Sequence, residues 1–375
     1  MTATSLERRA ALSWARGCQL PPQRLWRGLR EAGSLEALLC RPEADLARLL
    51  GSPERARALL RSVKDEEAQA WAAAIERTGT RLITAFDEEF PGLLREIPDP
   101  PFALFARGLL ERLKLPAVAV VGSRAASRYG REIAARIARD LSLAGVTVVS
   151  GFARGVDAAA HQAAREGPGG TIAVLGCGLD VDYPREHASL KEAMAKSDLL
   201  LSEYAPGTQP QARFFPVRNR IIAGLASGVV VVEASRRSGS LITARLANDC
   251  GRDVFAVPGS VFSATSAGAH ELLRDGAILC RGAEDILTEI LPTVRRRKAA
   301  PPANARTADI SEEARKVLAV LSREESATAE DLVTATDLPA ASVLAALFEL
   351  ESAGLAVEES GRYGLLLGPG LTARE

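Results

Sequence analysis

The spacing of hydrophobic positions changes along the chain and divides it into segments. From residue 1 to about residue 80, apolar residues follow a helical period, as in LEALLCRPEADLARLL (35–50). Ser52 and Pro53 separate two of these helices, because Ser52 can cap the second helix and Pro53 suits its first position. We predict an N-terminal helical module over 1–80, of the SAM-like or helix-hairpin-helix type. Its excess of Arg fits a module that helps hold a polyanion, and fits equally a basic surface without a ligand.

Residues 81–116 contain several prolines and short apolar pieces, which predict an extended connector that packs onto another part of the chain. From residue 117, short apolar runs alternate with helical patterns. Such an alternation predicts a parallel sheet covered on both faces, and so an α/β, doubly wound, extended Rossmann-like domain over 117–291. The runs are AVAVVG (117–122), VTVVS (146–150), TIAVLG (171–176), LLLSE (199–203), VVVVE (229–233) and VFAVPG (254–259).

The last part of the chain predicts a linker and a small domain. Residues 292–310 are basic and then rich in Pro and Ala, which is typical of a flexible linker. Residues 311–375 show three helical patterns and a hairpin, which predict a winged helix. Its third helical pattern carries no Lys or Arg, and acidic residues surround it, so we expect it to meet a basic protein surface instead of DNA.

Composition removes several classes of function. The five cysteines and three histidines are scattered, so the sequence predicts no metal site and no disulfide framework. The lack of a G-x-G-x-x-G fingerprint argues against a dinucleotide, and we expect no bound cofactor. The N-terminus has no apolar signal region, and no apolar stretch has the length of a membrane span. We expect a cytoplasmic protein that does not enter a membrane.

Polar loops follow several of the predicted strands. Ligands of open parallel sheets bind outside the carboxyl ends of the strands. Glycine lets the backbone approach a ligand closely, and N–H groups at helix N-termini bind anions, so these loops predict a phosphate-binding edge. We expect binding by Gly122, Ser123, Arg124 and Ser127 after the first strand, Gly151 and Arg154 after the second, and Gly239 and Ser240 after the fifth.

An enzymatic alternative remains open at this point. The chain lacks a G-x-G-x-x-G fingerprint, a G-x-S-x-G elbow and a Walker motif. The turn at Gly239 and Ser240 nevertheless resembles the phosphate-holding turn of Rossmann-like nucleotide phosphoribohydrolases. That alternative would act on nucleoside monophosphates with Glu233 as the base. His161 is a further catalytic candidate, although a histidine of a helix packed into the core is the plainer interpretation.

The arginines between residues 206 and 252 favour a longer ligand. A mononucleotide pocket needs one or two cations, whereas a nucleic-acid backbone uses a row of them. Phe214 and Phe215 lie beside some of these arginines, and a ring next to cations is the usual arrangement for single strands. Only Glu233 and Asp249 oppose them, and the arginines are Arg213, Arg218, Arg220, Arg236, Arg237, Arg245 and Arg252.

Together, several motifs resemble the DNA-processing protein A (DprA/Smf) family over roughly 95–285. The motifs are VGSRAASRYG, SGFARGVDAAAH, AVLGCGLDVDYP, FPVRNRIIAGLASGVVVVEASRRSGSLITA and GRDVFAVPGSVFSATSAGAHELLRDGA. The resemblance implies a non-enzymatic protein that binds and protects incoming single-stranded DNA. It also implies that the protein helps to load the RecA recombinase onto that DNA during natural transformation.

The resemblance also implies roles for individual residues. Family members bind DNA through the arginine of the GSR loop, here Arg124, and through the FPxRNR motif, here Phe215, Arg218, Asn219 and Arg220. Many relatives carry a lysine three residues before that phenylalanine; this chain has Ala212 there, with Arg213 next to it. The family forms dimers through the end of the Rossmann-like domain, which places His270, Leu273 and Leu279 in a homodimer interface.

Overall fold

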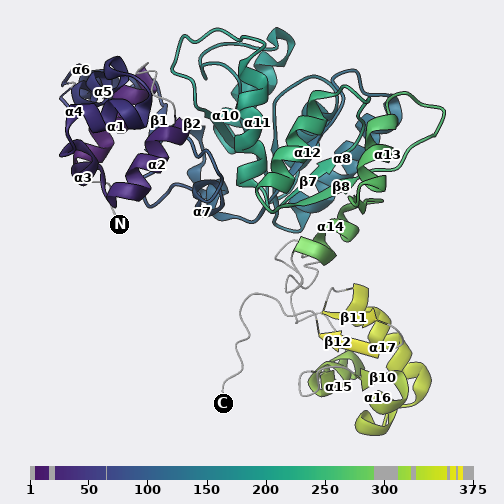
Figure 1. Ribbon diagram of the computed structural model, residues 1–375. Helices are drawn as coiled ribbons and strands as arrows, with labels where there is room; N and C mark the ends of the chain where they lie inside the picture. Colours follow the sequence, from purple (N-terminus) through teal and green to yellow (C-terminus); the bar gives the residue numbers. More distant parts are fainter. Residues whose placement is uncertain are drawn as a thin grey trace. The chain divides into compact units, whose positions relative to one another are not determined.

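The computed structural model describes residues 5–16, 22–64, 66–290, 311–321, 327–352, 355–359 and 362–365. The chain forms two compact units, residues 1–293 and 294–375, each with its own hydrophobic core. Figure 1 shows the helices and strands of both units. The predicted linker over 292–310 lies outside the described residues.

Within the described residues, six helices form the N-terminal part of the first unit. Ser52 accepts a hydrogen bond from the Arg55 N–H and Pro53 begins the next helix, which confirms the predicted helix boundary. Leucines from most of these helices share one buried core. The helices are α1 (Ser5–Arg16), α2 (Pro22–Ala32), α3 (Leu35–Leu39), α4 (Glu43–Leu50), α5 (Pro53–Ser62) and α6 (Glu66–Glu76).

Aromatic side chains attach these helices to the rest of the unit. The rings of Trp14 and Trp26 lie 4.4 and 4.5 Å from that of Phe102. The Trp26 indole N–H also donates a hydrogen bond to the Pro100 carbonyl at 2.8 Å. The helical module therefore packs directly against the segment that enters the sheet domain.

A nine-stranded sheet forms the centre of the first unit, in the order β1-β2-β6-β5-β4-β3-β7-β8-β9. The strands from β3 onward run parallel, whereas β1 and β2 are antiparallel to their neighbours. The strands are β1 (Arg81–Thr84), β2 (Ala103–Gly108), β3 (Ala117–Val121), β4 (Thr147–Ser150), β5 (Thr171–Leu175), β6 (Leu199–Ser202), β7 (Gly228–Val231), β8 (Asp253–Ala256) and β9 (Ile278–Leu279).

The segment 81–116 is more than the predicted connector. It supplies β1 and β2, the short helix α7 (Gly92–Arg95) and the 3-10 turn η1 (Leu110–Lys114). β2 pairs with β6, so this segment extends the main sheet. The strands were missed because they are short and separated by prolines, which the pattern treats as loop signals.

Helices cover both faces of the sheet, as expected for a doubly wound fold (Figure 1). Side chains alternate along β3: Val118 and Val120 pack with α8 and α9, whereas Ala119 and Val121 pack with α11 and α12. These helices are α8 (Arg128–Leu143), α9 (Val156–Ala164), α10 (Ala188–Ser197), α11 (Phe214–Leu225), α12 (Gly239–Asp249), α13 (Ala267–Arg274) and α14 (Ala283–Ile290).

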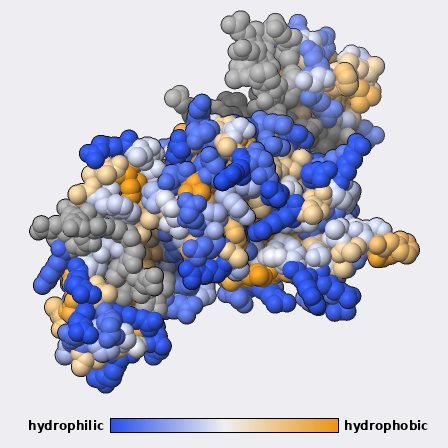
Figure 2. Space-filling view, turned by 90° about the horizontal axis from the view of Figure 1, so that it is seen from above, coloured by the Kyte–Doolittle hydropathy of each residue, from blue (hydrophilic) through white to orange (hydrophobic). Residues whose placement is uncertain are grey.

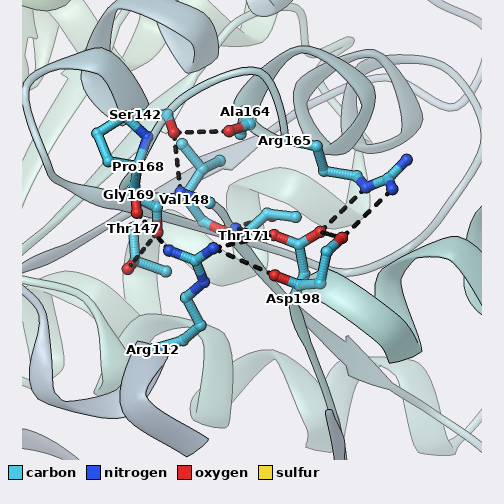
Figure 3. A network of polar contacts seen from close by, with 12 residues as sticks. Arg112, Ser142, Thr147, Val148, Ala164, Arg165, Pro168, Gly169, Thr171 and Asp198 are labelled. Atoms are coloured by element: carbon cyan, nitrogen blue, oxygen red, sulfur yellow. Dashed lines mark hydrogen bonds and ion pairs between the residues drawn. The ribbon is translucent and has the colours of Figure 1, made fainter. Parts of the chain in front are cut away.

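A polar network ties the parallel strands together at their amino ends (Figure 3). The buried Asp198 carboxylate accepts hydrogen bonds from the Thr171 N–H and from Arg165 Nε, both at 3.0 Å. Arg112 lies 3.9 Å from the same carboxylate. The network stabilises this edge of the sheet, and the opposite, carboxyl edge carries the loops predicted to bind phosphate.

The second unit has the arrangement of a winged helix, which confirms the predicted fold class. A small antiparallel sheet in the order β10-β12-β11 packs with three helices around a single core. The elements are α15 (Glu312–Leu321), β10 (Ala327–Thr328), α16 (Ala329–Thr336), α17 (Ala340–Ser352), β11 (Ala356–Glu359) and β12 (Arg362–Leu365). No single described helix is long and apolar enough to cross a membrane; α16 and α17 reach that length and composition only as a pair bent by 112°.

Candidate nucleic-acid interface

The sheet changes its direction of winding between β3 and β7. β3 lies between β4 and β7, so the chain leaves it toward one side first and returns on the other side later. Such a point opens a crevice at the carboxyl ends of the strands. Here the crevice is a cavity of about 690 Å³, and the predicted site residues that line it are Gly122, Ser123, Arg124, Phe215, Arg218, Asn219, Gly239 and Ser240.

Three side chains form a stack in the wall of this cavity. The Arg124 guanidinium lies 5.1 Å from the centre of the Phe215 ring. The Tyr183 ring stacks with the same phenylalanine at 5.6 Å, and Tyr183 is exposed. All three residues also line a second cavity of about 310 Å³, so the stack stands between two adjacent hollows. Tyr183 was not among the predicted site residues.

The N-terminus of α12 opens onto the larger cavity. Ser238 caps the helix, and its hydroxyl lies 2.7 Å from the Ser240 hydroxyl. Apart from the residues next to it in the chain, no described residue has an atom within 4 Å of the place where a Cβ on Gly239 would be, so the backbone there is open to a ligand. Asn219 donates a hydrogen bond from Nδ2 to the Gly239 carbonyl at 3.4 Å and so connects α11 to this turn. Free N–H groups and the helix dipole make such a turn attractive to a phosphate.

Arg218 supplies a fixed charge at the floor of both cavities. It is 4% exposed and donates hydrogen bonds to the carbonyls of Val174 and Gly151, the latter at 2.6 Å. Burial lowers the pKa of Arg218 to about 10, a shift that Asp157 opposes, so the side chain keeps its charge at neutral pH. A Cβ on Gly151 would lie 2.7 Å from the guanidinium and 2.9 Å from the Asp157 carboxylate, so glycine permits this packing.

Ser127 and Glu233 support the cavity from behind. The Glu233 carboxylate is 4% exposed and accepts hydrogen bonds from the Ser127 N–H at 2.8 Å and from its hydroxyl at 2.6 Å. Ser127 also caps α8 through the Gly130 N–H at 3.0 Å. Neither Ser127 nor Glu233 is among the described residues that line the cavity. Glu233 therefore holds the loop that carries Arg124, and its bonds leave it poorly placed to act as a base.

In the structure, some of the predicted arginines pair within the fold and others are exposed near the cavities. Arg220 is 8% exposed and pairs with Glu203 at 2.7 Å and Asp99 at 3.4 Å, so its charge is used within the fold. Arg252 similarly donates a hydrogen bond to a carbonyl of the 81–116 segment at 3.1 Å. The predicted DNA contact of Arg220 is therefore not available, because its side chain leaves α11 toward Asp99 and Glu203. Arg252, which lies between α12 and β8, is likewise turned toward the 81–116 segment.

Other predicted arginines lie at the rim. Arg213 is exposed at the start of α11, with its guanidinium 5.3 Å from the centre of the Phe214 ring. Arg154 is exposed beside the smaller cavity, where it pairs with Glu186. An exposed pair of this kind is weak, so Arg154 is free to exchange its partner for a phosphate.

The remaining predicted residues lie away from the cavity. His161 is fully buried, with Nδ1 2.6 Å from the Thr171 hydroxyl, and burial lowers its pKa to about 3. Of the predicted dimer residues, His270 lies against the Gly259 carbonyl at 3.1 Å, Leu273 is half-buried on α13, and Leu279 is 48% exposed on the edge strand β9. The described residues contain no cluster of His, Cys, Asp and Glu that could hold a metal ion.

Comparison with known proteins agrees with this architecture. The family model of DNA recombination-mediator protein A matches residues 81–291, and that of the DprA winged helix domain matches residues 299–362. The DNA processing protein DprA of Streptococcus pneumoniae is 49% identical over 203 residues, which are 54% of this chain and 72% of that protein.

Two solved structures are also similar. That of DprA from Streptococcus pneumoniae has a TM-score of 0.66 at 38% identity and covers 77% of this chain and 99% of its own. A structure of DNA processing protein A from Helicobacter pylori, described for its single-stranded DNA binding mode, has a TM-score of 0.52 at 31% identity and covers 57% and 96% of the two chains. The chain therefore belongs to the DNA-processing protein A (DprA/Smf) family of DNA recombination mediators.

Proposed function

We propose that the chain binds single-stranded DNA along the carboxyl edge of its large sheet. The observation that carries the proposal is the stack of Arg124, Phe215 and Tyr183 between two cavities. Tyr183, the exposed ring of the stack, is accessible to a base, and Arg124 supplies a cation beside it. Base–aromatic stacking contributes about 1–3 kcal/mol per base.

The surroundings of the stack suit a phosphate backbone. The N-terminus of α12, the buried Arg218 and Arg154 place positive charge on the walls of the two cavities. Arg213 is exposed next to Ala212, which lines the larger cavity. The bases of a duplex are stacked on one another and cannot reach a ring inside a crevice. Single strands expose their bases, so we expect the site to prefer them. The Helicobacter pylori relative, described for its single-stranded DNA binding mode, supports the same assignment.

For the wider role, we propose what the resemblance to the family implies. The chain is expected to act in the cytoplasm as a homodimer, without catalysis, protecting incoming single-stranded DNA and loading RecA onto it during natural transformation. The alternative of a nucleotide phosphoribohydrolase finds no support in the geometry, because both oxygens of Glu233 accept hydrogen bonds from Ser127. Release of a free base from nucleoside monophosphates by the purified protein would restore that alternative.

Fluorescence anisotropy with labelled oligonucleotides tests the binding. The full chain should bind an oligo(dT) of about 20 nucleotides more tightly than a duplex of the same length. Phe215→Ala should weaken the single-strand affinity by about 5-fold or more, because one stacking surface is lost. Phe214→Ala is the matched control, since the Phe214 ring packs on Tyr204 at 4.3 Å and does not line the cavity among the described residues. Equal effects of the two substitutions would contradict the proposal.

A strand-exchange assay tests the loading of RecA. Single-stranded DNA is first coated with a single-stranded DNA-binding protein, which slows RecA. The wild-type chain should shorten the lag, and Arg124→Ala should not. If the chain binds DNA but leaves the lag unchanged, the site is a DNA site and the proposed mediator step is wrong.

A further inference from the structure

The loop after β8, residues 257–266, carries two exposed apolar side chains at its tip. Val261 is 79% exposed and Phe262 is 97% exposed, the highest values among the exposed large hydrophobic residues described. Figure 1 shows this loop extending beside α13, and Figure 2 shows an apolar projection on that side of the molecule. A phenylalanine in water on an ordered loop costs free energy that a bound partner would recover.

Hydrogen bonds hold the loop in place. The Ala234 N–H donates to the Thr265 carbonyl at 2.8 Å, and the hydroxyls of Ser263 and Thr265 lie 2.8 Å apart. At the base of the loop, the Gly259 carbonyl lies 3.1 Å from Nε2 of His270. Two anchors on the β7 loop and α13 therefore fix the loop on either side of its apolar tip.

The loop lies at the same edge of the sheet as the cavity. The strand order β3-β7-β8 makes the loops that follow these strands neighbours at the carboxyl edge. Tyr129, on the first turn of α8, donates a hydrogen bond from its hydroxyl to the Pro258 carbonyl at 3.1 Å, and its ring is 49% exposed. Tyr129 thus connects the Arg124 loop to the base of the Phe262 loop.

Exposed arginines occupy the loop between them. Arg236 and Arg237 follow β7, and both are exposed. Arg236 forms an ion pair with Glu271 at 2.9 Å, and the two side chains are 76% and 38% exposed. An ion pair this exposed contributes little and is easily replaced by a phosphate. Along this edge of the sheet, the cavity is therefore followed by Arg236 and Arg237 and then by the loop tip with Phe262.

We propose that Phe262 and Tyr129 form a second base-stacking subsite for the DNA strand that occupies the cavity. The inference rests on the proposed function, because it extends the path of the same strand. In this arrangement Arg236 and Arg237 bind the backbone between the two subsites, and Phe262 stacks on a base that has left the cavity. Cations next to an exposed ring favour a nucleic acid over an uncharged protein surface.

Affinity as a function of oligonucleotide length tests the subsite. Oligo(dT) of about 5 nucleotides should fill the cavity only, whereas oligo(dT) of about 15 nucleotides should also reach Phe262. Phe262→Ala should weaken binding of the longer strand by about 5-fold or more and leave the shorter one unchanged. Phe262→Tyr should keep the wild-type affinity for both. Because the side chain is 97% exposed, neither substitution should disturb folding.

Controls separate this subsite from the cavity and from self-association. Arg124→Ala should weaken both lengths, since Arg124 lines the cavity. Equal affinities of wild type and Phe262→Ala for the longer strand would overturn the proposal. So would a change of molar mass in light scattering at unchanged DNA affinity, because the tip would then contact a second copy of the chain. If the wild type binds neither length, the proposed function itself is wrong.

Discussion

Replacing Arg124 by alanine tests the cavity through its dependence on salt. The side chain is exposed, lines both cavities, and lies over the Phe215 ring at 5.1 Å. The substitution removes one cation from the site and one contact that orients the ring. It leaves the Glu233–Ser127 hydrogen bonds intact, so the loop itself should keep its conformation.

The expected loss of DNA affinity in Arg124→Ala is that of one phosphate contact. A hydrogen bond to a charged group contributes about 1.5 kcal/mol at the low end of its range, and the low end applies because Arg124 is exposed. Losing this energy corresponds to roughly a tenfold loss of affinity. Each phosphate contact on single strands adds about 0.7 to the slope of log affinity against log salt. Between about 50 and 200 mM salt, the wild type should therefore lose about 2.6-fold more affinity than Arg124→Ala.

Anisotropy titrations with oligo(dT) at both salt concentrations measure the affinity and the slope. Arg124→Lys keeps the charge but lacks the planar guanidinium, so it should restore the slope and only part of the affinity. Arg136→Ala is the matched control, because Arg136 is a 69% exposed arginine of α8 that pairs with Asp140 at 3.9 Å. If Arg124→Ala and Arg136→Ala change the slope equally, Arg124 contributes only general charge and the reasoning is wrong.

Three further predictions concern assembly, the second unit and stability. Leu273→Arg with Leu279→Arg should convert a wild-type dimer into a monomer in light scattering; a monomeric wild type or a dimeric variant would refute this. The fragment 311–375 should not bind labelled DNA at low salt, and micromolar affinity there would make it a second DNA site. Asp198→Asn should lower the free energy of unfolding by about 2 kcal/mol and leave the DNA affinity unchanged. The loss is smaller than for a fully buried ion pair, because the arginine partners of Asp198 are partly exposed.

The prediction for the second unit rests on the surface of α17. In a winged helix, the helix after the turn usually reads DNA with basic and amide side chains. Here the exposed face of α17 carries Leu344, 53% exposed, and Phe348, 73% exposed, and the described part of the helix has no Lys or Arg. The acidic Glu330 and Asp337 lie on and after α16. We therefore expect this surface to repel phosphates and to meet a basic protein partner instead.

The sequence predicted the alternating elements and the polar loops at their ends, because period and glycine content are local properties. The six apolar runs became β3 to β8, and the Gly122–Arg124 and Gly239–Ser240 turns both line the cavity. Tyr183 could not be predicted as part of the stack. It enters the wall from the loop after β5, and only the packed fold brings it to Phe215.

The arginines of α11 show a second reason why the sequence could not predict the whole site. Arg218 and Arg220 stand two positions apart, and with 3.6 residues per turn their side chains leave the helix about 200° apart. One therefore faces the cavity, whereas the other meets Asp99 and Glu203. The motif alone cannot decide which arginine binds a ligand, because that depends on β1 and β2, whose segment packs on the other side of the helix and was expected to be a connector.

Photo-crosslinking tests the central claim most directly. A single-stranded oligonucleotide carrying 5-iodouracil is irradiated in complex with the full chain, and the crosslinked peptides are identified by mass spectrometry. The account predicts crosslinks to peptides containing Tyr183 or Phe215, whose rings form the stack between the cavities. Crosslinks found only in the helices α1–α6 or in residues 311–375 would contradict it.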